Sequence, residues 1–181
     1  MKQDVARRPH WRARLQANPE AVIAAAIFVV SAATLLGALF FQYVLKLPPC
    51  PLCLDERIAY HIVIPLSLLI AVAAGAGAPR TLLTAGFVVV LVTVLCGAAL
   101  AAYHAGVEWH FWAGPTDCSG PLGDLKAGGS MLSQLQTINV VRCDEAAWRF
   151  LGISLAGYDA LICLLMAALA AYGAVTARRS G

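Results

Sequence analysis

Cysteines are the residues of this sequence whose spacing could support redox or metal chemistry. The chain has six, of which Cys50 and Cys53 form a Cys-x-x-Cys motif, and Cys118 and Cys143 lie far downstream. Such a motif has three interpretations: a disulfide that closes a loop, half of a zinc site, or a redox-active dithiol. Zinc usually takes a second close pair of ligands. Cys118 and Cys143 are widely separated, and no histidine lies near either at ligand spacing. A zinc site is therefore the least favoured of the three interpretations.

The residues around the motif favour redox chemistry. Pro51 suits the first position of a helix, which predicts Cys50 as the N-cap and Cys53 in the first turn. Both sulfurs would then lie at the positive end of the helix dipole, which lowers the pKa of a thiol. Arg57 follows Cys53 by one turn on the same face, where a guanidinium stabilises a thiolate. Cys50 and Cys53 are therefore candidate catalytic residues, and Arg57 is a candidate contact for an electron acceptor dissolved in lipid.

The composition is that of a membrane protein. Of 181 residues, 60% are hydrophobic and only 13% are charged, and the mean hydropathy is +0.75. A soluble chain of this size has too small an interior to bury so much apolar surface. The net charge of +3 is too small and too dispersed for a nucleic-acid-binding surface. An ordinary soluble domain, a disordered chain and a nucleic-acid-binding module are thereby excluded.

The apolar residues fall into long stretches that are almost free of charge. About 20 apolar residues cross the hydrocarbon of a bilayer, and they must be helical because lipid cannot satisfy an open backbone. We therefore predict an all-α membrane protein, a four-transmembrane-helix bundle that forms a single membrane domain over residues 1–181. The expected spans are 21–45, 58–78, 81–105 and 154–177, after a cytoplasmic tail over 1–20.

Lysine and arginine predict the orientation of the bundle. They are concentrated in the tail over 1–20, in the turn between the second and third spans, and at the carboxyl end. The positive-inside rule then places both termini in the cytoplasm. The loops over 46–57 and 106–153 would lie on the opposite, periplasmic side, and they carry Cys50, Cys53, Cys118 and Cys143. Cysteines in such a compartment usually form disulfides.

The remaining polar and cysteine residues have structural explanations. Cys96 and Cys163 lie within spans, where cysteine mostly behaves as a small hydrophobic residue. Asp159 is predicted near the outer end of the last span, where the helix dipole favours a carboxylate. In the second loop, residues 130–139 have apolar positions at helical spacing and predict a short horizontal helix on the membrane surface.

The motif Cys50-Pro-Leu-Cys53-Leu-Asp-Glu-Arg57, together with Cys118 and Cys143, resembles the disulfide bond formation protein B family. These are bacterial inner-membrane thiol oxidases that act in the relay keeping the periplasm oxidising. The resemblance covers about residues 21–177 and includes the segments 103–109 and 143–150. Vitamin K epoxide reductases are related, but their Cys-x-x-Cys opens the last span, whereas this one opens the second.

The resemblance implies a role for each loop cysteine. Cys50 and Cys53 would be the pair next to a membrane quinone, either ubiquinone or menaquinone, with Cys53 interacting with the quinone and Arg57 assisting it. Cys118 would form the mixed disulfide with a periplasmic thioredoxin-like oxidant, and Cys143 would be its intramolecular partner. Some members have a histidine near the quinone. His104 and His110 flank that place, and neither is a clear counterpart.

The expected function is therefore that of a protein dithiol:quinone oxidoreductase in the bacterial inner membrane. Its partners would be the thioredoxin-like oxidant, the quinone pool and the lipid bilayer. The alternative is a four-span structural or assembly protein whose loop disulfides are static. The two hypotheses differ in how accessible the loop disulfides are to a reductant. Static disulfides resist mild reduction and need no electron acceptor.

Overall fold

The structure, a computed structural model, describes residues 18–115 and 142–179. Long helices dominate this part of the chain: α2 (Pro19–Tyr43), α3 (Pro51–Gly75), α4 (Arg80–Glu108) and α6 (Leu155–Arg179). These four are each long and apolar enough to cross a membrane. The predicted fold class, an all-α bundle of four membrane-spanning helices, is confirmed. The horizontal helix predicted over 130–139 lies outside the described residues.

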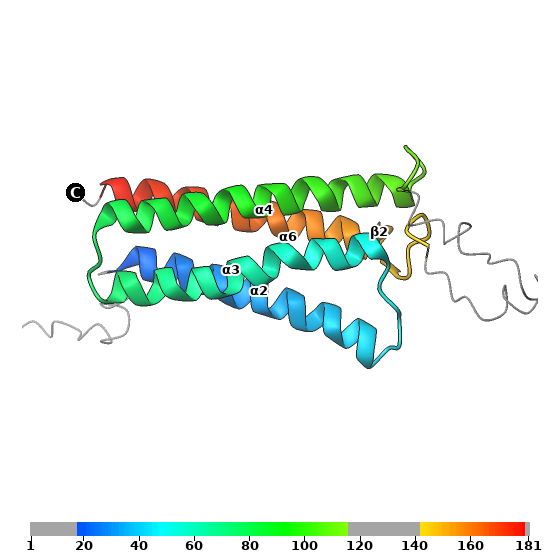
Figure 1. The fold of residues 1–181 in the computed structure, drawn as a ribbon, viewed down its shortest axis with the longest axis horizontal. Helices are drawn as coiled ribbons and strands as arrows, with labels where there is room; N and C mark the ends of the chain where they lie inside the picture. The colour runs from blue at the N-terminus through cyan, green and yellow to red at the C-terminus, as the bar shows by residue number, and fades with distance from the viewer. Residues whose placement is uncertain (1–17, 116–141, 180–181) are drawn as a thin grey trace, which may run out of the picture.

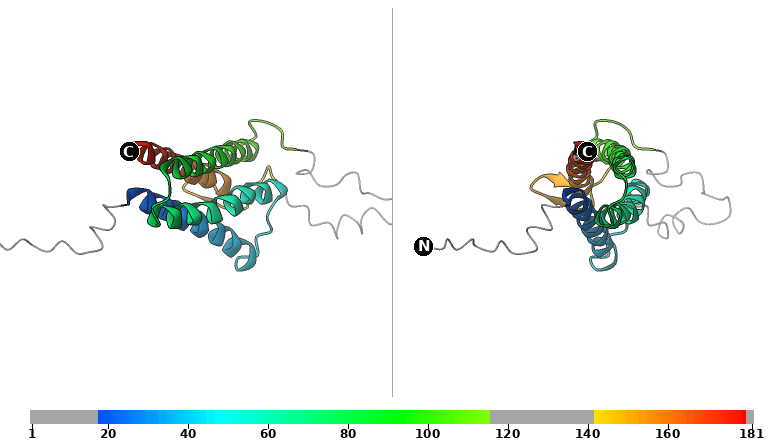
Figure 2. Two further views of the ribbon diagram at one scale, coloured as in Figure 1. Left: turned by 60° about the vertical axis from the view of Figure 1, so that its left-hand side comes forward. Right: turned by 90° about the vertical axis from the view of Figure 1, so that its left-hand side faces the viewer.

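The four helices form an elongated antiparallel bundle (Figure 1). The most extensive packing is between α4 and α6, and α3 packs against both α2 and α4. The start of α2 and the end of α6 lie at one end of the bundle, and the connection from α2 to α3 lies at the other (Figure 1). Towards that connection α2 leans away from the other helices, as both Figure 1 and Figure 2 show.

Helix ends follow local sequence. Pro19 and Pro51 each stand at the start of a helix, where the missing N–H of proline costs no hydrogen bond. The connection between α3 and α4 is short, and Gly77 there has φ +75°, a value that suits a residue without a Cβ. This tight turn makes α3 and α4 antiparallel neighbours.

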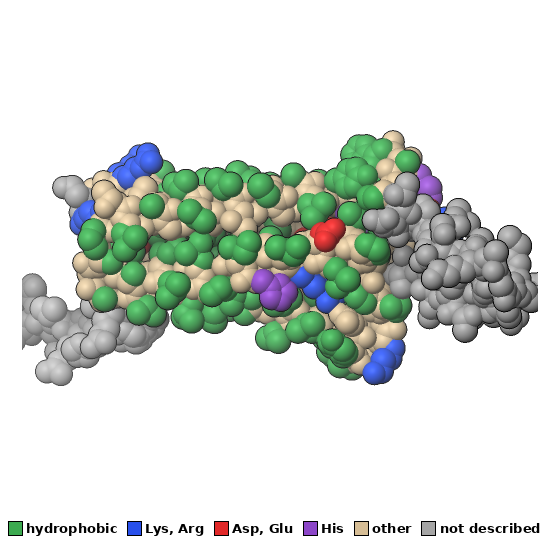
Figure 3. All heavy atoms as spheres, in the orientation of Figure 1, with side chains coloured by type: hydrophobic (Ala, Val, Ile, Leu, Met, Phe, Trp, Pro, Cys, Tyr) green, Lys and Arg blue, Asp and Glu red, His purple; other side chains and the backbone are tan. Residues whose placement is uncertain are grey.

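The surface of the bundle is as apolar as its interior. Hydrophobic side chains cover the flank seen in Figure 3. Large apolar residues are exposed on all four helices, for example Val29, Leu69, Val92 and Leu164. Exposed apolar surface on this scale is not tolerated in water by a monomeric soluble protein, and it suits a lipid environment.

A two-residue turn follows the second loop and leads into α6. β1 (Arg149–Phe150) pairs antiparallel with β2 (Ile153–Ser154). The turn residues Leu151 and Gly152 have φ of 50° and 83°, the positive values that a tight hairpin of the most favoured type requires. Arg149 Nη2 donates to the Glu108 carbonyl at 3.2 Å, which joins the hairpin to the end of α4.

Close packing between α4 and α6 depends on a glycine. A Cβ built on Gly173 would lie 2.6 Å from Phe87 Cε1, and Phe87 is fully buried. We expect Gly173→Ala to lower the free energy of unfolding by about 1–3 kcal/mol, the usual cost of overpacking a core. Thermal unfolding in detergent micelles measures this. Gly37→Ala in α2 is the control, because nothing lies within 4 Å of its added Cβ. An equal loss in both variants would contradict the packing argument.

Candidate functional site

The Cys-x-x-Cys motif caps α3. Cys50 is the N-cap residue, and its Sγ accepts a hydrogen bond from the Cys53 backbone N–H at 3.2 Å. Cys53 lies in the first turn, so the predicted placement of both residues is confirmed. Both are free thiols, Cys50 buried and Cys53 half-buried. The side-chain hydrogen bond with Cys53 lowers the pKa of the Cys50 thiol below its ordinary value, against the opposing effect of burial. Cys50 therefore has the character of a reactive thiol.

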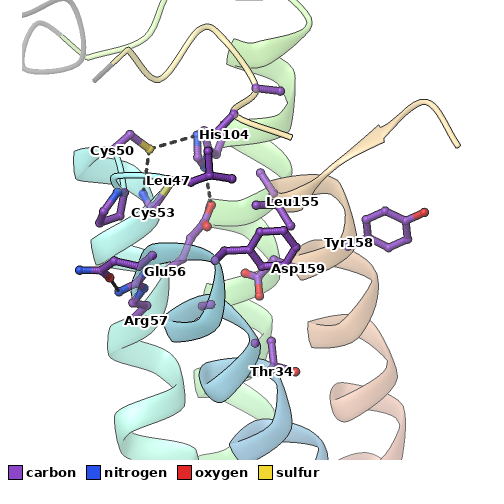
Figure 4. A pocket seen from close by; sticks show the side chains of 18 of the residues that line it. Thr34, Leu47, Cys50, Cys53, Glu56, Arg57, His104, Leu155, Tyr158 and Asp159 are labelled. Carbon is purple, nitrogen blue, oxygen red and sulfur yellow. Dashed lines mark hydrogen bonds and ion pairs between the residues drawn. The ribbon is translucent and has the colours of Figure 1, made fainter. Parts of the chain in front are cut away.

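A buried histidine from α4 contacts this thiol. His104 Nε2 lies 3.5 Å from Cys50 Sγ, and its Nδ1 lies 2.8 Å from Glu56 Oε1 of α3 (Figure 4). Only 3% of the His104 surface is exposed. On α4 itself, Glu108 Oε1 is 4.0 Å from His104 Nε2. The result is a buried chain, Glu56–His104–Cys50, that joins α3 to α4. A carboxylate that orients an imidazole beside a thiol is the arrangement that activates a nucleophile.

Sequence reasoning did not select this histidine. The resemblance left His104 and His110 as equal candidates, and the structure places His104 at the cysteines, whereas His110 follows the end of α4. No motif in the sequence gave Glu56 or Glu108 a role in the site. One feature of the sequence indicates all three, because ionisable residues inside or bordering apolar spans are rare and usually functional.

An apolar cavity of about 450 Å³ adjoins the two cysteines. Its walls come from all four helices, from the loop that precedes Cys50 and from the segment that begins at Arg142. Cys50, Cys53, Glu56, Arg57 and Asp159 are among its lining residues, and Figure 4 shows several of them around it. A mostly apolar cavity with a few convergent polar groups is typical of a small-molecule site.

Arg57 lies in the wall of this cavity, one turn beyond Cys53. Its Nη1 donates to Gln42 Oε1 of α2 at 2.6 Å. The guanidinium therefore bridges α3 to α2 in the wall of the cavity (Figure 4). This contact fixes the orientation of a cation beside the Cys-x-x-Cys motif.

Asp159 also lines the cavity. Its Oδ1 accepts a hydrogen bond from the Tyr60 hydroxyl, which also lies 3.6 Å from Cys163 Sγ. Its Oδ2 is buried and has no hydrogen-bond partner within residues 18–115 and 142–179. Asp159 is in an early turn of α6, where the sequence placed it, but its carboxyl group faces the cavity between the helices (Figure 4).

The second-loop cysteine that the structure describes packs beside the first pair. Cys143 is 1% exposed and shares a small apolar cluster with Cys50, Leu52 and Val107. It is disulfide-bonded. Cys118 lies outside the described residues. Of the two span cysteines, Cys96 is exposed and Cys163 is buried between helices.

Comparison with known proteins identifies related chains. The family model described as "Disulfide bond formation protein DsbB" matches residues 20–173. A protein named "Disulfide bond formation protein B" from Aromatoleum aromaticum is 28% identical over 158 residues, which cover 86% of this chain and 92% of that one. Proteins of the same name from Psychrobacter and Hahella chejuensis are 33% and 32% identical, covering 71% and 67% of this chain and 76% and 73% of theirs.

The matched region contains all four membrane-spanning helices apart from their outermost residues, and with them the Cys-x-x-Cys motif, His104 and the cavity. The chain therefore belongs to the disulfide bond formation protein B family, whose members are multi-pass membrane proteins of disulfide formation.

Proposed function

We propose that this protein is a protein dithiol:quinone oxidoreductase, which reoxidises a periplasmic thioredoxin-like oxidant and passes the electrons to a membrane quinone. The observation that carries the proposal is the contact between His104 and Cys50 at the mouth of the apolar cavity. A thiol with an adjacent base and an adjacent apolar site can be oxidised there by a lipid-soluble acceptor.

The residues of the cavity fit a quinone. A quinone has an apolar ring and tail and two carbonyl oxygens that only accept hydrogen bonds. The mostly apolar lining suits the ring, and the Arg57 guanidinium, which has several N–H donors and gives one of them to Gln42, offers a donor in the wall. When bound, the quinone supplies the capacity to accept two electrons and two protons. Both ubiquinone and menaquinone share this chemistry.

The proposed reaction moves one electron pair through two cysteine pairs. A thiolate of the reduced partner attacks Cys118 of a Cys118–Cys143 disulfide, Cys143 leaves as a thiolate, and the second partner thiol resolves the mixed disulfide. The Cys118 and Cys143 thiols then reduce a Cys50–Cys53 disulfide by the same exchange. Packing of Cys143 against Cys50 supports this second exchange, because it puts one sulfur of the second pair beside the first pair.

Oxidation of the Cys50–Cys53 dithiol closes the cycle. His104 takes the proton of the Cys50 thiol, with Glu56 orienting the imidazole and stabilising its positive charge. Cys53 faces the cavity, and Arg57 provides positive charge there. Two electrons and two protons leave the dithiol as its disulfide forms. The quinone would accept the two electrons and the two protons.

The experiment is quinone reduction by the purified protein with a reduced thioredoxin-like substrate. We expect quinol to form with one substrate disulfide made per quinone consumed. Disulfides that resist mild reduction, with no dependence on quinone, would favour the alternative of a static structural protein.

The proposed orientation in the bacterial inner membrane puts both termini in the cytoplasm and both cysteine loops in the periplasm. A membrane-impermeant thiol reagent added from outside should then label Cys118 of the reduced protein, whereas Cys143 is shielded by its burial beside Cys50. Labelling only from the cytoplasmic side would overturn this orientation.

Arg57 provides a separate test of the cavity. Arg57→Ala is expected to lower quinone-dependent efficiency by about tenfold to a hundredfold, since losing a hydrogen bond to a charged group costs on the order of 1.5–3 kcal/mol. Arg57→Lys should be milder if charge alone matters and equally impaired if the planar guanidinium matters. Kinetics with varied quinone measure this, with Arg80→Ala at the far end of the bundle as the control. Quinone dependence like that of the wild type would make Arg57 a membrane-surface anchor.

A further inference from the structure

We propose that the reduced Cys50–Cys53 pair and His104 form a binding site for Zn²⁺. The two sulfurs and one imidazole nitrogen lie within 4.8 Å of one another. The sequence disfavoured zinc because it offered no second close pair of ligands, and no histidine at ligand spacing from Cys118 or Cys143. The fold supplies a histidine from α4, which meets the start of α3 at this point.

The spacing of these atoms suits tetrahedral zinc. Bonds of about 2.3 Å to sulfur and 2.0–2.1 Å to nitrogen place a sulfur and a nitrogen ligand about 3.5 Å apart at the tetrahedral angle. Cys50 Sγ and His104 Nε2 are 3.5 Å apart. Zinc could therefore bind both atoms without a shift of α3 relative to α4.

The groups around the ligands also suit a metal. A zinc-bound histidine almost always donates its other ring N–H to a carboxylate or carbonyl, which fixes the tautomer and raises its basicity. His104 has this arrangement, because its Nδ1 lies 2.8 Å from Glu56 Oε1 while its Nε2 faces Cys50. Glu56 thus holds the imidazole in the form that binds a cation.

A further carboxylate, that of Glu108, lies near the imidazole, outside the group formed by the two sulfurs and the histidine. Glu108 Oε1 is 4.0 Å from His104 Nε2, and its Oε2 is buried with no hydrogen-bond partner in the part of the chain that the structure describes. An unpartnered buried oxygen of this kind is costly, and a bound cation would satisfy it. Two cysteines, one histidine and a fourth oxygen ligand is a set that zinc accepts.

Binding is restricted to the reduced protein. Two thiols lose their protons as two zinc–sulfur bonds form, so one Zn²⁺ binds and two H⁺ are released. A Cys50–Cys53 disulfide has no thiolate to offer. Zinc therefore holds the pair in its reduced state and, where the proposed function applies, inhibits reoxidation. The binding itself does not depend on that function.

The test is a titration of the reduced, detergent-solubilised protein with Zn²⁺ in competition with a chromophoric chelator, without quinone or substrate protein. We expect one zinc per chain that depends on Cys50 and Cys53. Glu56→Gln should weaken binding by about tenfold to a hundredfold, as expected for an outer-shell partner, and His104→Ala by more. The thiols of the second loop are present in the wild type and in all these variants, so any zinc that they bind contributes equally to every titration.

Two controls separate a specific site from adventitious binding. His61→Ala removes an exposed histidine of α3, and Cys96→Ala removes an exposed thiol. Neither should change the affinity. With Co²⁺ as a second probe, sulfur-to-metal charge-transfer absorption should appear in the wild type and weaken in Cys50→Ser, which keeps only one of the two proposed sulfur ligands. Cys50→Ser is a small change and guards against a folding defect in the His104 variant. Equal affinity in the wild type and His104→Ala, or cobalt absorption of undiminished intensity in Cys50→Ser, would overturn the proposal.

Discussion

Replacing either Cys50 or Cys53 by alanine is expected to abolish reduction of quinone by a dithiol substrate. The Cys50–Cys53 disulfide cannot form when one of its sulfurs is missing. The electron pair then has no path from the second-loop cysteines to the cavity. Exchange between the second-loop pair and the partner should continue, because Cys118 and Cys143 remain. Quinol formation and trapping of the mixed disulfide with the partner measure the two activities separately.

The cysteines within the spans provide matched controls. Cys96→Ala removes an exposed thiol and should keep full turnover. Cys163→Ala should also keep turnover, although Cys163 lies 3.6 Å from the Tyr60 hydroxyl. Loss of turnover in either variant, in protein that still inserts and folds, would reveal a working thiol outside the two loop pairs. Turnover in Cys50→Ala would refute the assigned path.

The sequence was sufficient for features that depend on neighbouring residues. Length and hydropathy define the spans because lipid imposes one rule on every crossing segment. Proline at position 51 and the cysteine before it define the start of α3, since helix capping is a local property. The predicted N-cap at Cys50 therefore agrees with the structure.

Features that depend on which face of each helix turns towards its neighbours could not be predicted from neighbouring residues in the sequence. The approach of His104 to Cys50 requires one particular face of α4 to meet the start of α3. The spans are apolar on every side, so no amphipathic pattern indicates which face turns inward. For the same reason the sequence placed Asp159 in an early turn of the last span but did not predict its contact with Tyr60 in the cavity wall.

The hairpin before α6 was missed for a different reason. Its turn uses Leu151 at φ 50°, a conformation that is rare for a residue with a Cβ. Only Gly152 marked the turn in the sequence, and a lone glycine beside strands of two residues is too weak a pattern to predict a hairpin.

His104→Ala is expected to lower both stability and turnover. Removing one partner of a buried pair leaves Glu56 uncompensated in an apolar setting, which typically costs about 3–5 kcal/mol of unfolding free energy. Loss of the base beside Cys50 should lower the rate of dithiol oxidation by roughly 10²–10⁴-fold. Thermal unfolding and quinone kinetics on the same preparation measure the two effects.

The pH dependence of turnover distinguishes a base from a structural residue. In His104→Ala the thiol of Cys50 must ionise without help, so the rate should recover as the pH rises, whereas a purely structural defect gives a loss that is the same at every pH. Glu56→Gln keeps the imidazole but weakens its orientation, and its rate should fall between those of the wild type and His104→Ala. His61→Ala, which removes an exposed histidine from α3, should match the wild type throughout. A pH-independent loss in His104→Ala, in protein that retains its fold, would assign His104 to the packing of α3 against α4 alone.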